Sequence, residues 1–243
     1  MTSLVWSRTT EDAFSDPYEY LVEKQFRREA HAFLSGLMGV LATRNATFKA
    51  GDQSLEKAQW MLANDAVQSA LDCLDAIEVG KHRIASKLFR CMFEGMDRLQ
   101  FFSTGTQKAK ASLGRWYQGG QIHHRDIREW IEVARGPSAK EASKKAFGDL
   151  SQFLHGAYRA LLDGYSRGKG DRMIYDGCFD SAFLVPRQTL SVYHVVLAQL
   201  ITRLHWTLAE TGTMEPEVLL ALWRKSLETH TVPRRFSAKR RAG

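Results

Sequence analysis

The stretch KHRIASKLFRCMFEGMDRLQFF, residues 81–102, decides the fold class of this chain. Its apolar side chains recur every three or four positions, which is the spacing that gathers them on one side of an α-helix. They are Ile84, Leu88, Cys91, Met92, Met96 and Leu99. The sequence Ser103-Thr104-Gly105 that follows is typical of a helix end. The stretch therefore predicts one long amphipathic helix from Lys81 to Phe102.

The same period continues on both sides of this stretch. Asp16-Pro17-Tyr18-Glu19 and Pro137-Ser138-Ala139-Lys140-Glu141 have the residue order of a capped helix start, with Asp16 and Ser138 as the caps. Further helices are predicted at about 17–43, 55–77, 107–117, 124–134, 138–162, 187–210 and 214–228. The connections between most of them are short. We therefore predict an all-α protein, a single bundle of about eight helices with a disordered basic C-terminal tail.

The chain divides into three parts by this pattern. Residues 1–15 show no sustained period and predict a flexible N-terminal arm, residues 16–230 predict the helical bundle, and residues 231–243 predict the basic tail. Residues 164–187 are rich in Gly, Asp and Arg and form the longest predicted irregular stretch inside the bundle. This stretch is interpreted as either a functional loop or a mobile connector.

Composition favours a globular cytoplasmic protein. The 243 residues are 44% hydrophobic and 25% charged, which is ordinary for a folded domain. The three cysteines, Cys73, Cys91 and Cys178, form no Cys-x-x-Cys pair, which argues against a disulfide framework and a thiolate zinc site. The chain opens without a basic-then-apolar leader, and its longest uncharged runs are shorter than the roughly 20 residues that span a bilayer. We expect a cytoplasmic protein with no membrane contact, no metal and no cofactor.

Charge is distributed unevenly along the chain. The first 80 residues hold 12 acidic and 7 basic residues, whereas residues 81–175 hold 9 acidic and 18 basic ones. The tail adds the basic residues Arg234, Arg235, Lys239, Arg240 and Arg241. Such segregation predicts either a protein partner, including a second copy of this chain in a homodimer, or nucleic acid bound through the basic middle segment and the tail.

The polar side of residues 81–102 is as regular as the apolar side. Arg83, Lys87, Arg90, Glu94 and Arg98 follow one another at steps of three or four residues. One interpretation is a solvated face with weak ion pairs between successive turns. The other is that Arg90 and Glu94 point inward as a hydrogen-bonded pair, because they sit between Phe89 and Phe93.

A second polar group lies in LSQFLHG, residues 150–156. Ser151 and His155 are one helical turn apart, and Arg159 continues the same line. A serine beside a histidine can be a nucleophile and its base, but no aspartate stands at a spacing that would orient the imidazole. We therefore favour a structural histidine that is bonded to a buried carboxylate.

Two motifs stand out together and are separated by short helices: Leu88-Phe89-Arg90-x-x-Phe93-Glu94 and Leu150-Ser151-x-x-x-His155-Gly156. This combination resembles a group of bacterial helical-bundle proteins of unknown function. The group is distantly similar to the HEPN-type bundles of defence and mobile-element operons. The resemblance covers about residues 60–205. It implies a helical bundle in which Arg90, Glu94, Ser151 and His155 form a polar cluster between packed helices. It implies a fold more than an activity.

HEPN-type ribonucleases also carry an arginine followed, after four to six residues, by a histidine. Arg187 and His194 fit this spacing and share one helical face, because they are seven positions apart; Arg224 and His230 do not share a face. The sequence thus leaves two hypotheses. The first is a non-catalytic helical bundle that binds a partner protein or nucleic acid, and the alternative is a HEPN-like ribonuclease toxin that uses Arg187 and His194.

Overall fold

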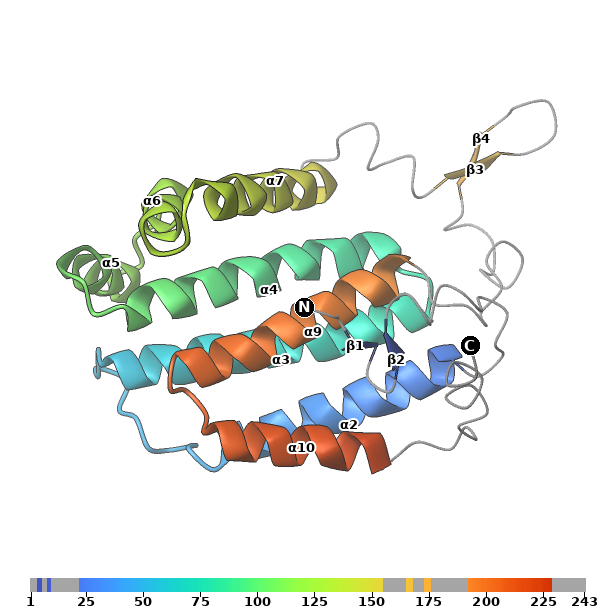
Figure 1. The fold of residues 1–243 in the computed structure, drawn as a ribbon, viewed down its shortest axis with the longest axis horizontal. Helices are drawn as coiled ribbons and strands as arrows, with labels where there is room; N and C mark the ends of the chain where they lie inside the picture. The colour runs from blue at the N-terminus through green and yellow to red at the C-terminus, as the bar shows by residue number, and fades with distance from the viewer. Residues whose placement is uncertain are drawn as a thin grey trace, which may run out of the picture.

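The computed structural model describes residues 4–5, 8–9, 22–154, 165–167, 173–175 and 192–228 of the chain. Eight helices account for most of them, which confirms the predicted all-α class (Figure 1). The helices are α2 (Val22–Ala42), α3 (Leu55–Glu78), α4 (His82–Ser103), α5 (Gln107–Tyr117), α6 (His124–Arg135), α7 (Pro137–Leu154), α9 (Val192–Glu210) and α10 (Pro216–Glu228). Most helix ends lie within one or two residues of their predicted positions.

Helix α4 is the central element of the bundle. It contacts α3, which precedes it in the chain, and also α5, α6, α7 and α9. Figure 1 shows α3, α4 and α9 running side by side, with α2 and α10 along one edge of this group and α5, α6 and α7 along the other. The residues that follow α4 in sequence therefore pack on one side of it, and α9 returns to pack on another.

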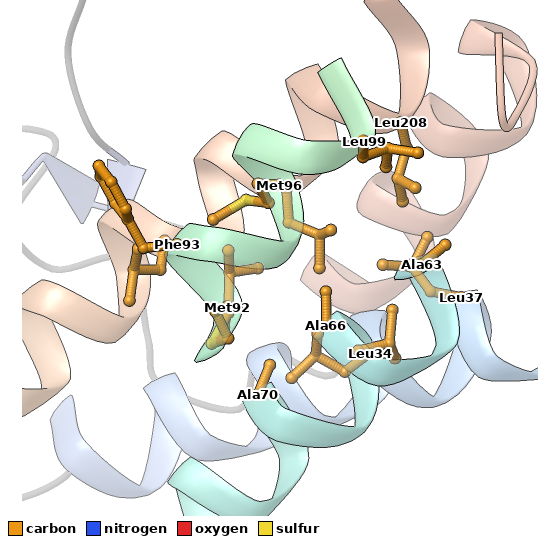
Figure 2. Close-up of a cluster of buried hydrophobic side chains, with 14 of the residues drawn as sticks. Leu34, Leu37, Ala63, Ala66, Ala70, Met92, Phe93, Met96, Leu99 and Leu208 are labelled. Atoms are coloured by element: carbon orange, nitrogen blue, oxygen red, sulfur yellow. The ribbon is translucent and has the colours of Figure 1, made fainter. Parts of the chain in front are cut away.

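The core forms where α2, α3, α4 and α9 meet (Figure 2). Helix α3 presents small side chains to this region, which lets its neighbours approach closely. Its alanines Ala63, Ala66 and Ala70 are buried. Helix α4 contributes longer side chains, Met92 and Met96, which are fully buried and whose flexible stems fill irregular space. The apolar stripe predicted for residues 81–102 therefore contributes to the core through these methionines, whereas Ile84 and Cys91 are exposed.

Two helix starts have side-chain caps that were not predicted. The hydroxyl of Ser54 accepts a hydrogen bond from the Lys57 amide at 3.2 Å, and the hydroxyl of Thr106 accepts one from the Ala109 amide at 3.2 Å. The predicted cap at Ser138 is wrong, because α7 already begins at Pro137. Proline suits the first helical position, and Gly136 before it has φ 87, a conformation that suits glycine and separates α6 from α7.

Four short strands lie outside the helices. Strands β1 (Leu4–Val5) and β2 (Arg8–Thr9) pair in antiparallel fashion within the predicted arm, and β1 contacts α9. Strands β3 (Tyr165–Arg167) and β4 (Met173–Tyr175) pair within the stretch predicted as irregular. Strands of only two or three residues are too short to produce a recognisable period in the sequence, so they were not predicted.

Among the described helices, none combines the length and the apolar character that crossing a bilayer would require.

Candidate functional site

Three charged side chains of α4 form a compact cluster. Arg90 Nε donates to Glu94 Oε1 at 2.6 Å, and Arg98 Nη2 donates to Glu94 Oε2 at 2.8 Å. The side chains of Arg90 and Glu94 are only 17% and 16% exposed. The inward-pointing pair of the two sequence interpretations is therefore present, with Arg98 as an additional partner.

Helices α6 and α7 complete the cluster. His124 on α6 places Nε2 3.5 Å from Glu94 Oε1, and its ring centroid lies 3.9 Å from that of Phe147 on α7. The guanidinium of Arg90 stacks over the same Phe147 ring, 4.5 Å from its centroid. Arg90 thus contacts the helix that carries Ser151, and the cluster joins three helices at one point.

Burial of Glu94 by itself opposes ionisation, yet the close contact with His124, the hydrogen bond from Arg90 and the charge of Arg98 lower the pKa of Glu94 to about 2. A carboxylate with such a low pKa holds no proton at neutral pH. Glu94 is therefore unsuited to donate or accept a proton in general acid–base catalysis near pH 7.

The cluster contains no activated nucleophile within the described residues. The hydroxyl of Ser151 donates to the Phe147 carbonyl at 2.6 Å, so it is bonded along its own helix instead of to a base. His155, the predicted fourth member, lies outside the described residues. The Arg90 Nη1 and His124 Nε2 atoms are buried without a hydrogen bond in the described part of the chain. That part also holds no group of three His, Cys, Asp or Glu side chains that suits a metal ion.

A second polar network, which the sequence analysis missed, joins α4 to α9. Asp97 is fully buried and accepts a hydrogen bond from Arg203 Nη2. The Arg203 guanidinium lies 4.5 Å from the Phe93 ring centroid, and Gln100 beside it donates to Glu210 Oε2 at 2.6 Å. One signal for this network was present in the sequence. Arg203 is the only Lys or Arg in the otherwise apolar helix 192–210, where a charge needs a buried partner.

His194, half of the predicted ribonuclease pair, is only 6% exposed. Its ring packs edge-on against Phe26, with centroids 5.6 Å apart. Burial and the nearby His82 lower the pKa of His194 to about 4, so the imidazole is neutral at pH 7. Arg187 lies outside the described residues, and its pairing with His194 stays a prediction.

Most basic side chains of helices α5, α6 and α7 are paired with acids of the same protein. Helices α5, α6 and α7 carry nine Lys and Arg residues. Seven of the nine form ion pairs: Lys108, Arg115, Arg125, Arg135, Lys140, Lys144 and Lys145. The tail residues predicted to bind nucleic acid, Arg234, Arg235, Lys239, Arg240 and Arg241, lie outside the described residues.

The exposed side of the α3–α4 pair has a different character. We call it the α3–α4 outer face and define it by the exposed residues Met61, Asp65, Gln68 and Asp72 of α3 and Arg83, Ile84, Lys87 and Cys91 of α4. Met61 and Ile84 are 41% and 49% exposed. Partial burial, and then the charge of Asp65, raise the pKa of Cys91.

No protein family, curated protein or solved structure matches this sequence.

Proposed function

We propose that this chain is a non-catalytic α-helical bundle that acts by binding a partner protein, and that the α3–α4 outer face is its binding surface. The observation that carries the proposal is the composition of this face. It combines exposed apolar side chains with charges of both signs, and within the described residues Asp65, Arg83 and Lys87 form no ion pair. A protein partner with complementary charges can bind a surface that combines exposed apolar groups with unpaired charges of both signs.

The charge pattern favours a protein over nucleic acid as the partner. Nucleic acid binding needs a stripe of basic groups that are free to contact phosphates. On helices α5 to α7 most of these groups are already bonded to carboxylates, and on the α3–α4 outer face Asp65 and Asp72 would repel a phosphate backbone. A protein surface with complementary charges meets no such repulsion.

The chemistry of the buried groups favours a non-catalytic role. The Arg90–Glu94–His124 cluster ties α6 and α7 to α4, and the ionised Glu94 is neutralised by its neighbours. His194 is buried against Phe26. These groups support the bundle, and the ribonuclease alternative has no comparable support in the described residues.

The binding hypothesis is tested by affinity purification of tagged protein from its native cells. The chain with Asp65→Lys and Asp72→Lys should lose a protein that the wild type retains. A matched control, Glu215→Lys with Glu217→Lys, makes the same charge change at exposed positions by the start of α10 and should retain it. Retention by all three forms would contradict the α3–α4 outer face as the binding surface.

The catalytic and nucleic-acid alternatives are tested with labelled RNA and duplex DNA. We expect no RNA cleavage. If the wild type cleaves RNA and His194→Ala does not, the ribonuclease hypothesis is established instead. Growth arrest on expression of the wild type but not of His194→Ala would establish it too. We also expect no tight nucleic-acid binding. If binding does occur through the tail, deleting residues 233–243 should make the slope of log affinity against log salt shallower by up to about 4.5 on duplex DNA.

A further inference from the structure

We infer that the partner on the α3–α4 outer face is a second copy of this chain, bound about a two-fold axis that runs parallel to α3 and α4. This inference rests on the proposed function and specifies its partner. In such a homodimer α3 of one copy lies over α4 of the other, and the same contact occurs twice. The argument rests on where the two kinds of charge lie on the face.

The acidic charges of the face form a row on α3. Asp65 and Asp72 are seven residues apart, which is two helical turns, so they point to the same side. Both are exposed. Asp72 accepts a hydrogen bond from Gln68 at 2.8 Å, and its negative charge has no cationic partner among the described residues.

The basic charges form a row on α4 at a similar height along the bundle. Arg83 and Lys87 are four residues apart and both are exposed. Asp72 is level with this basic row, because its neighbour Cys73 donates through Sγ to the carbonyl of Ala85, which lies between Arg83 and Lys87, at 3.6 Å. Asp65 lies two turns away, at the height of Cys91. Each molecule therefore carries Asp72 beside the basic row, with Asp65 continuing the acidic row past it.

Only one two-fold arrangement makes these rows complementary. An axis parallel to the helices keeps the height of each residue and exchanges left with right, so Asp72 of α3 meets Arg83 and Lys87 of α4 in the other copy. An axis across the helices in the plane of the interface would lay α3 on α3 and α4 on α4. It would bring like charges together, which is unfavourable.

The size of the face suits a weak dimer. It extends over about 15 residues of helix, from Met61 to the level of Arg83, so with a rise of about 1.5 Å per residue and a width of about 10 Å per helix it offers on the order of 450 Å² per copy. This is below the roughly 800 Å² per partner of a standard interface and is typical of a transient one. Met61 and Ile84 supply apolar area within the face, and no other element of the described structure covers them.

The test uses two complementary variants of the full chain. The acidic-row variant carries Asp65→Lys with Asp72→Lys, and the basic-row variant carries Arg83→Glu with Lys87→Glu. Sedimentation velocity on the wild type should show a monomer–dimer equilibrium below about 100 µM that weakens as salt is raised. Each variant alone should raise the dissociation constant by at least about 100-fold, because every contact then joins like charges. Glu215→Lys with Glu217→Lys should leave it unchanged.

Mixing the two variants gives the decisive measurement. In a heterodimer of the acidic-row and basic-row variants, both helix contacts join opposite charges, so the mixture should form dimers although neither variant does alone. Circular dichroism and melting temperatures show that each variant is folded. Recovery of the dimer on mixing supports the inference.

Three results would overturn the inference: a wild type that stays monomeric at about 100 µM, dimers that persist in either variant, or no recovery on mixing. These outcomes are separate from those of the proposed function. A monomeric wild type leaves the binding of another protein intact, whereas RNA cleavage, or capture that is equal for the wild type and the Asp65→Lys, Asp72→Lys variant, contradicts the proposed function itself.

Discussion

Lys57 shows how one residue fixes a loop. Its ammonium group is buried and donates to the carbonyls of Lys49, Ala50 and Asp52 at 2.9, 2.7 and 2.8 Å. The ring of Tyr117 lies beside it, with its centroid 5.6 Å from Nζ. A lysine is rarely buried without partners, and here three carbonyl oxygens replace its water. The connection between α2 and α3 is thereby held against the first turn of α3.

Replacing Lys57 by methionine should destabilise the protein. The variant keeps the apolar stem but removes three charge-assisted hydrogen bonds, so we expect the free energy of unfolding to fall by about 3 kcal/mol. Urea unfolding followed by circular dichroism measures this. Lys49→Met removes an exposed side chain from the same loop and should change the free energy by less than about 0.5 kcal/mol. Equal effects of both variants would show that the carbonyl contacts contribute nothing.

Glu94 is the residue on which the three-helix cluster depends. Glu94→Ala leaves Arg90 and Arg98 without their counter-charge in a largely buried place. We expect the free energy of unfolding to fall by about 2 kcal/mol and the melting temperature by several degrees. Glu141→Ala, which removes an exposed partner of Lys144, is the control and should have little effect. If Glu94→Ala lowers the melting temperature by less than about one degree, the Arg90–Glu94 pair contributes no more than a surface ion pair.

His194 should make the stability depend on mildly acidic pH. The folded protein holds this imidazole neutral with a pKa of about 4, whereas an unperturbed histidine has a pKa of 6.5. Between those values the unfolded chain binds a proton that the folded chain does not. Stability is therefore complete above pH 6.5 and decreases as the pH falls toward 4, by up to about 3 kcal/mol.

Urea midpoints measured from neutral pH down to about pH 4.5 should show this slope, and His194→Gln should make it shallower. Burial also lowers the pKa of His205, which adds to the slope in both proteins. The difference between the two proteins therefore reports His194 alone. Identical slopes would mean that His194 is not buried as a neutral group.

The elements themselves were largely predictable from the sequence. The helix predicted at 81–102 is observed at His82–Ser103, and the one predicted at 107–117 is observed at Gln107–Tyr117. Long amphipathic periods determine where a helix lies because burial of one face outweighs local preference. Helix ends are harder to predict than helices: α7 begins at Pro137, although the residue pattern after it suits Ser138 as the N-cap. The hairpins β1–β2 and β3–β4 are too short to produce a period at all.

Helices α2 and α10 approach closely at Gly36. A Cβ atom on Gly36 would lie 2.7 Å from Leu222 Cδ2, closer than carbon atoms can pack. Gly39, one turn further along α2, has no atom within 4 Å of the corresponding position. Glycine is otherwise unfavourable inside a helix, so its presence at Gly36 fits the close approach of α10.

We therefore expect Gly36→Val to lower the free energy of unfolding by about 1–3 kcal/mol and Gly39→Val to change it by less than about 0.5 kcal/mol. Valine suits the test because its branched side chain cannot turn away from α10. Chemical denaturation of the two variants measures the difference. Equal stabilities would show that Leu222 moves aside at no cost.

At the scale of the whole molecule, the sequence showed the total charge but not its pairing. The net charge of +7 and the basic middle segment suggested nucleic acid, yet ion pairs such as Lys108 with Asp126 and Arg135 with Glu210 join different helices. Such pairs depend on tertiary contacts, which no linear spacing reveals. The Arg90–Glu94 pair could be predicted because its partners are one turn apart on one helix. Asp97 and Arg203 could not, because 106 positions separate them.

The central place of α4 also has a consequence for how the chain is made. Helices α2, α3 and α4 are neighbours in sequence and meet through local contacts, but α9 joins them only after nearly 90 further residues have been synthesised. Until α9 has left the ribosome, the apolar side chains that it covers on α3 and α4 are exposed to water. Newly made protein in this state is prone to aggregation and is a substrate for chaperones. Completion of the core is therefore a late event in translation.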